Sequence, residues 1–243
     1  MKVTNIKSIL PYINFSVPIG VGTSAICFLM KNGNVLKLYI NTHLKYELFH
    51  KYDMEEHLIF LNKIKNDSYI GPEEILIKND EVIGYIYPYV PGKVIKNLNN
   101  NIKLKSLINA YEKLYKDTIL ISNDSYKLQD LHQKNIIFNN NIYIIDVYKG
   151  YFDESNIDNL FIKNMGYINK TIINAIFNLK FFEYLKFRDD KLDELYYSSL
   201  YENPIIFYEL LERLFYKDLN KKEVNQNTHI YIYEINPNYY NMM

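Results

Sequence analysis

Cysteine, tryptophan and long apolar runs are scarce or missing in this chain of 243 residues. The single cysteine, Cys27, excludes an internal disulfide bond and any cysteine-rich zinc site, and it agrees with a reducing compartment. No apolar run approaches the roughly eighteen residues of a membrane span, and no continuous apolar core precedes Pro11. We therefore expect a cytoplasmic protein that is neither exported nor inserted into a membrane.

An excess of charge is missing as well, because 28 Lys and Arg residues balance 28 Asp and Glu residues. Without a net field there is little to attract nucleic acid or an anionic lipid surface, so we expect neither as a partner. The chain also lacks Gly-x-Ser-x-Gly, His-Glu-x-x-His and any Cys/His cluster. Hydrolase and zinc-enzyme hypotheses therefore have no support from motifs.

What is present begins with the pattern of a β-sheet. Residues 13–40 are short β-rich stretches broken at Gly20-Val21-Gly22 and at an Asn-Gly turn in 31–34, which predicts two or three antiparallel strands. Residues 44–64 lack Gly and Pro and predict one long helix. Two further strands are expected at 74–78 and 82–87.

The second part of the chain has mainly helical patterns. A helix is expected over residues 102–120, and a small hairpin over 136–138 and 142–147. Residues 156–219 are expected to be largely helical. The proline-interrupted segment after Tyr87 predicts a boundary near residue 90, so the order of elements favours an α+β fold with a β-rich first part and a helical second part.

The most specific segment for chemistry runs from residue 128 to 136 and continues in the hairpin that leads to Asp146. Phosphoryl transfer needs a carboxylate to orient or deprotonate the acceptor hydroxyl, and hard oxygen ligands to hold magnesium against the phosphates. Asp130, Asn135 and Asp146 supply these groups in one short stretch. Each could instead form local backbone bonds in a loop, as Asp and Asn often do.

Asp130-Leu131, then Asn135, then a short hairpin ending in Asp146 resembles the catalytic and metal loops of the protein-kinase superfamily. The resemblance implies a two-lobed kinase-like fold, with a small antiparallel β-sheet and one long helix in the N-lobe (residues 1–90) and a mainly α-helical C-lobe (residues 91–243). It implies ATP and Mg²⁺ as cofactors. It also implies that Asp130 is the catalytic base and that Asn135 and Asp146 are the metal ligands.

The resemblance extends upstream to the nucleotide. Gly20 and Gly22 occupy the place of the glycine-rich phosphate loop, although a plain strand turn explains this segment equally well. Lys37 matches the strand lysine that contacts the α- and β-phosphates, with an exposed strand lysine as the alternative. The family pairs that lysine with a helix glutamate, here Glu56 or its neighbour Glu55.

A hinge that meets adenine is implied by the segment that starts at Tyr87, which would be the gatekeeper. The carbonyl of Pro88 and the backbone amide of Val90 would then bind the base, and the missing N–H of proline is tolerated at the first of these positions. Cys27 would lie over the adenine ring, where we assign it packing only.

Departures from the family pattern bear on the acceptor. His132 makes the loop Asp-Leu-His-x-x-Asn, which is similar to aminoglycoside kinases, choline kinases and other atypical members, and we count His132 with the catalytic residues. No Ala-Pro-Glu follows Asp146, so little chain is left for a peptide platform. We expect transfer of the γ-phosphate of ATP to a hydroxyl, with protein Ser/Thr favoured in the manner of atypical bacterial-type protein kinases. The alternatives are a small-molecule kinase and a pseudokinase that only binds nucleotide.

Overall fold

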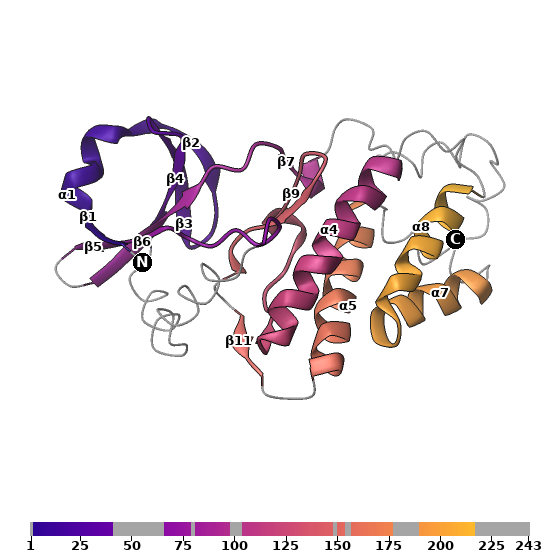
Figure 1. The fold of residues 1–243 in the computed structure, drawn as a ribbon. Helices are drawn as coiled ribbons and strands as arrows, with labels where there is room; N and C mark the ends of the chain where they lie inside the picture. Colours follow the sequence, from indigo (N-terminus) through magenta and orange to yellow (C-terminus); the bar gives the residue numbers. More distant parts are fainter. Residues whose placement is uncertain are drawn as a thin grey trace.

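The computed structural model describes residues 2–40, 66–78, 81–97, 104–147, 150–153, 157–176 and 190–216. A β-sheet occupies one end of the molecule and a group of helices the other (Figure 1). The expected α+β class is therefore confirmed. The helix expected at 44–64 lies outside the described residues.

The sheet has six strands in the order β1-β5-β6-β4-β3-β2. Their bounds are β1 Lys2–Asn5, β2 Ile13–Val21, β3 Ala25–Met30, β4 Asn34–Tyr39, β5 Glu74–Lys78 and β6 Glu81–Pro88. Neighbouring strands are antiparallel, as expected, except that β1 pairs with β5 in parallel. Strand β1 and the short helices that follow it, α1 (Ile6–Ile9) and η1 (Leu10–Tyr12), were not expected from the sequence.

Alternation along the strands gives the sheet two apolar faces. One face, beneath α1, contains Phe28, Leu36 and Ile86, all buried. The other contains the tyrosines Tyr39 and Tyr85, whose rings meet edge to face with centroids 5.9 Å apart. The second face also carries Lys37, because the Lys37 ammonium lies 6.0 Å from the centre of the Tyr39 ring.

Helices α4, α5, α7 and α8 make up the larger core at the other end of the molecule (Figure 1). Their bounds are α4 Leu104–Asn123, α5 Ile157–Ile176, α7 Asp190–Tyr201 and α8 Phe207–Tyr216, with 3-10 turns η2 Ile95–Asn97, η3 Gln133–Asn135 and η5 Pro204–Ile206. Helices α5 and α7 approach closely at Gly166, where a Cβ would lie 2.0 Å from the carbonyl oxygen of Leu200. None of the helices in the described ranges is long and apolar enough to cross a membrane.

Two small sheets support the loops between these helices. The first contains β7 (Lys93–Val94), β9 (Ile136–Phe138) and β10 (Ile142–Ile144) in the order β10-β9-β7. The second pairs β8 (Tyr126–Lys127) with β11 (Tyr151–Phe152). The expected hairpin is thus confirmed, but its second strand ends at Ile144 rather than at 147, because Asp146 has a left-handed backbone with φ 60°.

The chain just before β5 is attached to the helical core. The carboxylate of Asp117 on α4 accepts hydrogen bonds from the backbone N–H of Asp67 at 3.1 Å and of Ser68 at 2.9 Å. The buried hydroxyl of Tyr69 shares a 2.6 Å hydrogen bond with Thr118, one residue further along α4. These bonds fix where β5 enters the sheet relative to the helices.

Candidate functional site

An ion pair between Lys37 and Asp146 joins the sheet to the loop after β10. The Lys37 Nζ lies 2.6 Å from the Asp146 Oδ1, and the two side chains are 9% and 26% exposed. Burial is the largest influence on the pKa of Lys37 and acts to lower it, but the charge and hydrogen bond of Asp146, together with Tyr39 and Cys27, outweigh burial, so the pKa of Lys37 is raised from its ordinary value. The lysine is therefore a fixed positive charge at neutral pH.

Backbone hydrogen bonds tie Asp146 to the loop that contains Asp130 and Asn135. The N–H of Ile145 donates to the carbonyl oxygen of Asn135 at 2.9 Å. The side-chain amide of Asn135, which is buried, donates to the carbonyl oxygen of Asp130 at 3.3 Å. Asp130, Asn135 and Asp146 are thereby brought into one neighbourhood, with Lys37 beside them.

The geometry of this loop depends on two aspartates with positive φ. Asp130 has φ 52° and Asp146 has φ 60°, a region that Asp and Asn enter more readily than other side chains with a Cβ. Between them η3 begins after His132, whose carbonyl accepts a 2.8 Å hydrogen bond from the N–H of Asn135. The side chain of His132 is exposed and forms no hydrogen bond with a described residue, so its catalytic role stays a prediction.

Asn164 on helix α5 binds the chain just before Asp130, and the sequence analysis did not single this residue out. Its amide oxygen accepts from the N–H of Leu128 at 2.9 Å, and its amide nitrogen donates to the carbonyl of Tyr126 at 2.8 Å and to the hydroxyl of Ser122 at 3.0 Å. A buried amide with three partners is costly to replace. The sequence signal was available, since Asn164 interrupts an apolar face that continues at Ile168 and Ile172.

Tyr126 is a second supporting residue that the sequence analysis missed. Its fully buried hydroxyl donates to the carbonyl of Val147, the residue after Asp146, and burial raises the pKa of that hydroxyl. Gly150 lies flat against the ring, because a Cβ there would be 2.4 Å from Tyr126 Cζ. With 25 tyrosines in the chain, nothing in the sequence distinguished this one.

The predicted phosphate-loop glycines lie at the turn between β2 and β3. Gly20 is opposite Cys27, and Cys27 is opposite Lys37, so the three form a row across neighbouring strands. Gly22 closes the turn with a 2.8 Å hydrogen bond from its N–H to the carbonyl of Ala25. Burial raises the pKa of the Cys27 thiol, while the charge of Lys37 opposes that shift. Gly20 and Lys37 therefore lie in one row across the sheet, with Cys27 on β3 between them.

The predicted hinge residues lie at the end of β6 and just beyond it. Tyr87 is buried against Tyr85, with ring centroids 6.2 Å apart. Pro88 is the last residue of β6 and pairs with Asn34, and Val90 is buried in the segment that follows. Glu56 and Glu55 lie outside the described residues.

The oxygen atoms of Asp146 and Asn135 are of the kind that Mg²⁺ prefers, and a site with only two protein ligands is usual when phosphates and water complete the coordination. The Asn135 amide nitrogen is engaged with Asp130, which leaves its amide oxygen to accept. No group of three or more His, Cys, Asp or Glu side chains gathers in a metal-binding arrangement in the part of the chain that the structure describes. The donor set fits magnesium held with a phosphate better than a metal held by protein alone.

No protein-family model and no curated protein matches the chain. Among solved structures the chain is similar to the twitchin kinase fragment of C. elegans, described as an autoregulated protein kinase and immunoglobulin domains. The two are 14% identical, with a TM-score of 0.45 over 60% of this chain and 34% of that chain. The similarity therefore spans about a third of the length of that structure.

Proposed function

We propose that this chain is an ATP- and Mg²⁺-dependent phosphotransferase with a two-lobed, kinase-like fold, which moves the γ-phosphate of ATP to a hydroxyl acceptor. The observation that carries the proposal is the 2.6 Å ion pair between Lys37 and Asp146, 109 residues apart. A lysine on the sheet, a carboxylate after the hairpin and the Asp130–Asn135 loop meet at one place. That is the set of charges that phosphoryl transfer requires.

The nucleotide would bind on the sheet face that carries Lys37. The lysine ammonium would contact the α- and β-phosphates, and the turn with Gly20 and Gly22 would cover them with backbone N–H groups. Pro88 and Val90 would bind the adenine edge, and Glu56 would orient the lysine. The row from Gly20 through Cys27 to Lys37 supports this placement, because it aligns the turn with the lysine.

Asp146 and the amide oxygen of Asn135 would hold Mg²⁺, whose charge neutralises that of the phosphates when it is bound. Asp130 would accept the proton of the acceptor hydroxyl as the new O–Pγ bond forms and the bond from Pγ to the bridging oxygen of ADP breaks. Asp130 is exposed, so an acceptor can reach it. His132, exposed beside it, would contact the acceptor.

Protein Ser/Thr side chains are the favoured acceptors, and a small hydroxyl compound is the alternative. A pseudokinase that binds nucleotide without turnover is the other alternative. Incubation with γ-labelled ATP and, in separate reactions, casein, choline and an aminoglycoside distinguishes them by where the label appears. Label on none of these, with Mg-ATP still bound, would favour the pseudokinase.

The experiment that tests the nucleotide site is thermal unfolding with ATP, with and without Mg²⁺. A ligand at a hundred times its dissociation constant stabilises a protein by about 2.7 kcal/mol, which is enough to raise the melting temperature measurably. We expect an upward shift that needs Mg²⁺ and that is lost in Asp146→Ala. The matched control is Asp124→Ala, an exposed aspartate near the end of α4, which should keep the shift. No shift in the unmodified protein at millimolar Mg-ATP would overturn the proposal.

A further inference from the structure

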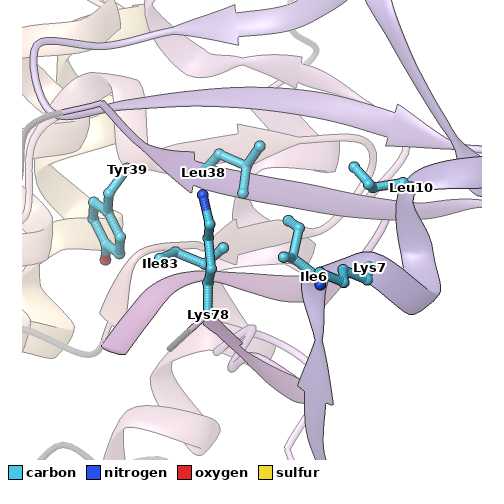
Figure 2. A pocket seen from close by; sticks show the side chains of 7 residues that line it. All are labelled: Ile6, Lys7, Leu10, Leu38, Tyr39, Lys78 and Ile83. Carbon is cyan, nitrogen blue, oxygen red and sulfur yellow. The ribbon is translucent and has the colours of Figure 1, made fainter. Parts of the chain in front are cut away.

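A cavity of about 490 Å³ lies beside α1 (Figure 2). Its lining comes from α1, η1 and strands β4, β5 and β6, and consists of Ile6, Lys7, Leu10, Leu38, Tyr39, Lys78 and Ile83. Ligand pockets in proteins commonly enclose roughly 300–1,000 Å³. The cavity is therefore large enough for a small organic molecule.

The floor of the cavity is apolar. Ile6, Leu38 and Ile83 are half-buried and pack against the buried cluster beneath α1. Leu10 lies at the side of the opening and is 44% exposed, which is high for a leucine. An apolar body placed here would cover Leu10 and extend the existing core, and burial of such surface is favourable by about 25 cal/mol per Å².

The charged side chains that line the cavity are both cationic, and the phenol of Tyr39 is its other polar group. In Figure 2, Lys78 reaches from β5 toward Leu38 on β4, and Lys7 approaches from α1. Both lysines are exposed, and neither has an ion-pair partner among the described residues. The lining residues include no acidic side chain. The charge of the opening is thus complementary to an anion.

We propose that this cavity is a binding site for an amphipathic monoanion, specifically a medium-chain fatty carboxylate. Its carboxylate would lie between Lys7 and Lys78 and its alkyl chain over Ile6, Leu38 and Ile83. A nucleotide fits poorly, because a polyphosphate would have to desolvate against an apolar floor with only two cations at the rim. A neutral lipid would leave both lysines unused.

The site is distinct from the proposed nucleotide site, although β4 contributes to both. Leu38 follows Lys37 directly, and successive side chains of a strand point to opposite faces. Tyr39 also lines the cavity and lies on the Lys37 face, but Lys37 itself is not among the lining residues. The proposed carboxylate contacts Lys7 and Lys78 rather than Lys37, so decanoate binding can fail or hold independently of Mg-ATP binding.

Isothermal titration with decanoate, below its critical micelle concentration, tests the proposal. We expect saturable binding to the unmodified protein, and a loss of affinity of about tenfold or more in Lys7→Glu/Lys78→Glu, as two reversed charges near a protein surface would produce. The matched control is Lys93→Glu/Lys96→Glu, which changes the net charge equally at exposed lysines outside the cavity and should bind decanoate normally. Decanol, which has the same tail without the charge, should bind all three proteins alike.

A second variant keeps the test valid if the charge-reversed protein fails to fold. Leu10→Ser changes an exposed residue, so the fold should persist. The substitution should weaken the binding of both decanoate and decanol, because both place their alkyl chain against Leu10. Absence of decanoate binding to the unmodified protein would overturn the proposal. Equal affinity in the unmodified and Lys7→Glu/Lys78→Glu proteins would also overturn it, because binding would then be non-specific adsorption.

Discussion

Two aspartates define the candidate site, and they have different neighbours. Asp146 is paired with Lys37. Asp130 is exposed, and its negative charge acts on Tyr167, where burial is the larger cause of the raised pKa and the charge of Asp130 the second. This difference agrees with one aspartate that acts on the nucleotide and its metal and another that acts on the acceptor.

Asp130→Asn tests that division. Asparagine is the other residue that readily adopts positive φ, so the loop at φ 52° should be retained. We expect the affinity for Mg-ATP, measured by calorimetry, to be unchanged and turnover to fall by about 10²–10⁴-fold, the usual contribution of a positioned acid or base. Loss of nucleotide affinity and turnover in equal measure would show that Asp130 shapes the loop rather than serving the acceptor.

The sequence predicted the members of the cluster better than their support. Asp130, Asn135 and Asp146 could be selected from their residue types and spacing, and Lys37 from the resemblance to the protein-kinase superfamily. Their roles in a phosphate and metal site stay a prediction. Asn164 could not be selected in that way, since its partners, two backbone groups and the hydroxyl of Ser122, are 36 to 42 positions away, which no local pattern specifies. The exposed side chain of His132 depends likewise on how η3 turns.

At the scale of elements, the approach of β4 to β6 controls where Lys37 lies. Gly84 of β6 is opposite Leu38, and a Cβ at this glycine would be 2.2 Å from the carbonyl oxygen of Lys37. The two strands can therefore be this close only because Gly84 has no side chain.

Gly84→Ala should consequently push β4 and β6 apart. We expect a loss of about 1–3 kcal/mol in the free energy of unfolding, as for other overpacked sites, measured in urea without nucleotide. Gly20→Ala is the control, because its Cβ would meet the Cys27 Cβ at an ordinary 3.7 Å and should leave stability nearly unchanged. Equal effects of the two substitutions would mean that the strands adjust freely around Gly84.

The loop after β10 depends on one tyrosine hydroxyl. Tyr126→Phe removes one hydrogen bond to the Val147 carbonyl. Because that carbonyl still accepts a 3.1 Å hydrogen bond from the N–H of Gly150, the free energy of unfolding should fall by only about 1 kcal/mol. We expect a weaker affinity for Mg-ATP as well, because Val147 follows Asp146 directly. Tyr197→Phe, at an exposed position, should change neither quantity. A stability loss with normal Mg-ATP affinity would assign Tyr126 a purely structural role.

The types of the elements were predicted from the sequence more reliably than their end residues or the strand β1 at the edge of the sheet. The strand expected at 74–78 coincides with β5, and the helix expected at 102–120 is α4 with its bounds moved to Leu104–Asn123. Strand β1 was missed because four residues carry little periodic signal, and its partner β5 lies some seventy residues away. Parallel pairing over such a distance is decided by packing rather than by local pattern.

At the scale of the whole molecule, the sheet and the helices are joined at separate points. The segment 66–70 is fixed to α4 through Asp117 and Thr118, and Ile70 donates a 2.9 Å hydrogen bond to Ile144 of β10. The Lys37–Asp146 pair is a further link, and it is an ion pair between two side chains, whereas the others are hydrogen bonds. The stability of the arrangement should therefore respond to the charge of this one pair.

A double-mutant cycle with Lys37→Met, Asp146→Asn and the combined variant measures that response without nucleotide. We expect a coupling of about 0.5–3 kcal/mol in urea unfolding, since each single change leaves the other partner in a poorly solvated place. The pair Lys191 and Glu194 on α7, 3.3 Å apart but 45% and 69% exposed, is the control and should couple by about 0.5 kcal/mol or less.

The pH dependence gives the same cycle a second readout. The folded-state pKa of Lys37 is raised above its unfolded value, so its stabilising contribution is fully present below the unfolded pKa and is lost as the pH rises through the folded one. Between neutral pH and about pH 10 the coupling should thus stay constant, and it should fall only above that range. A coupling near zero at neutral pH would show that the ion pair adds nothing to the stability of the fold and that Lys37 and Asp146 serve the proposed chemistry instead.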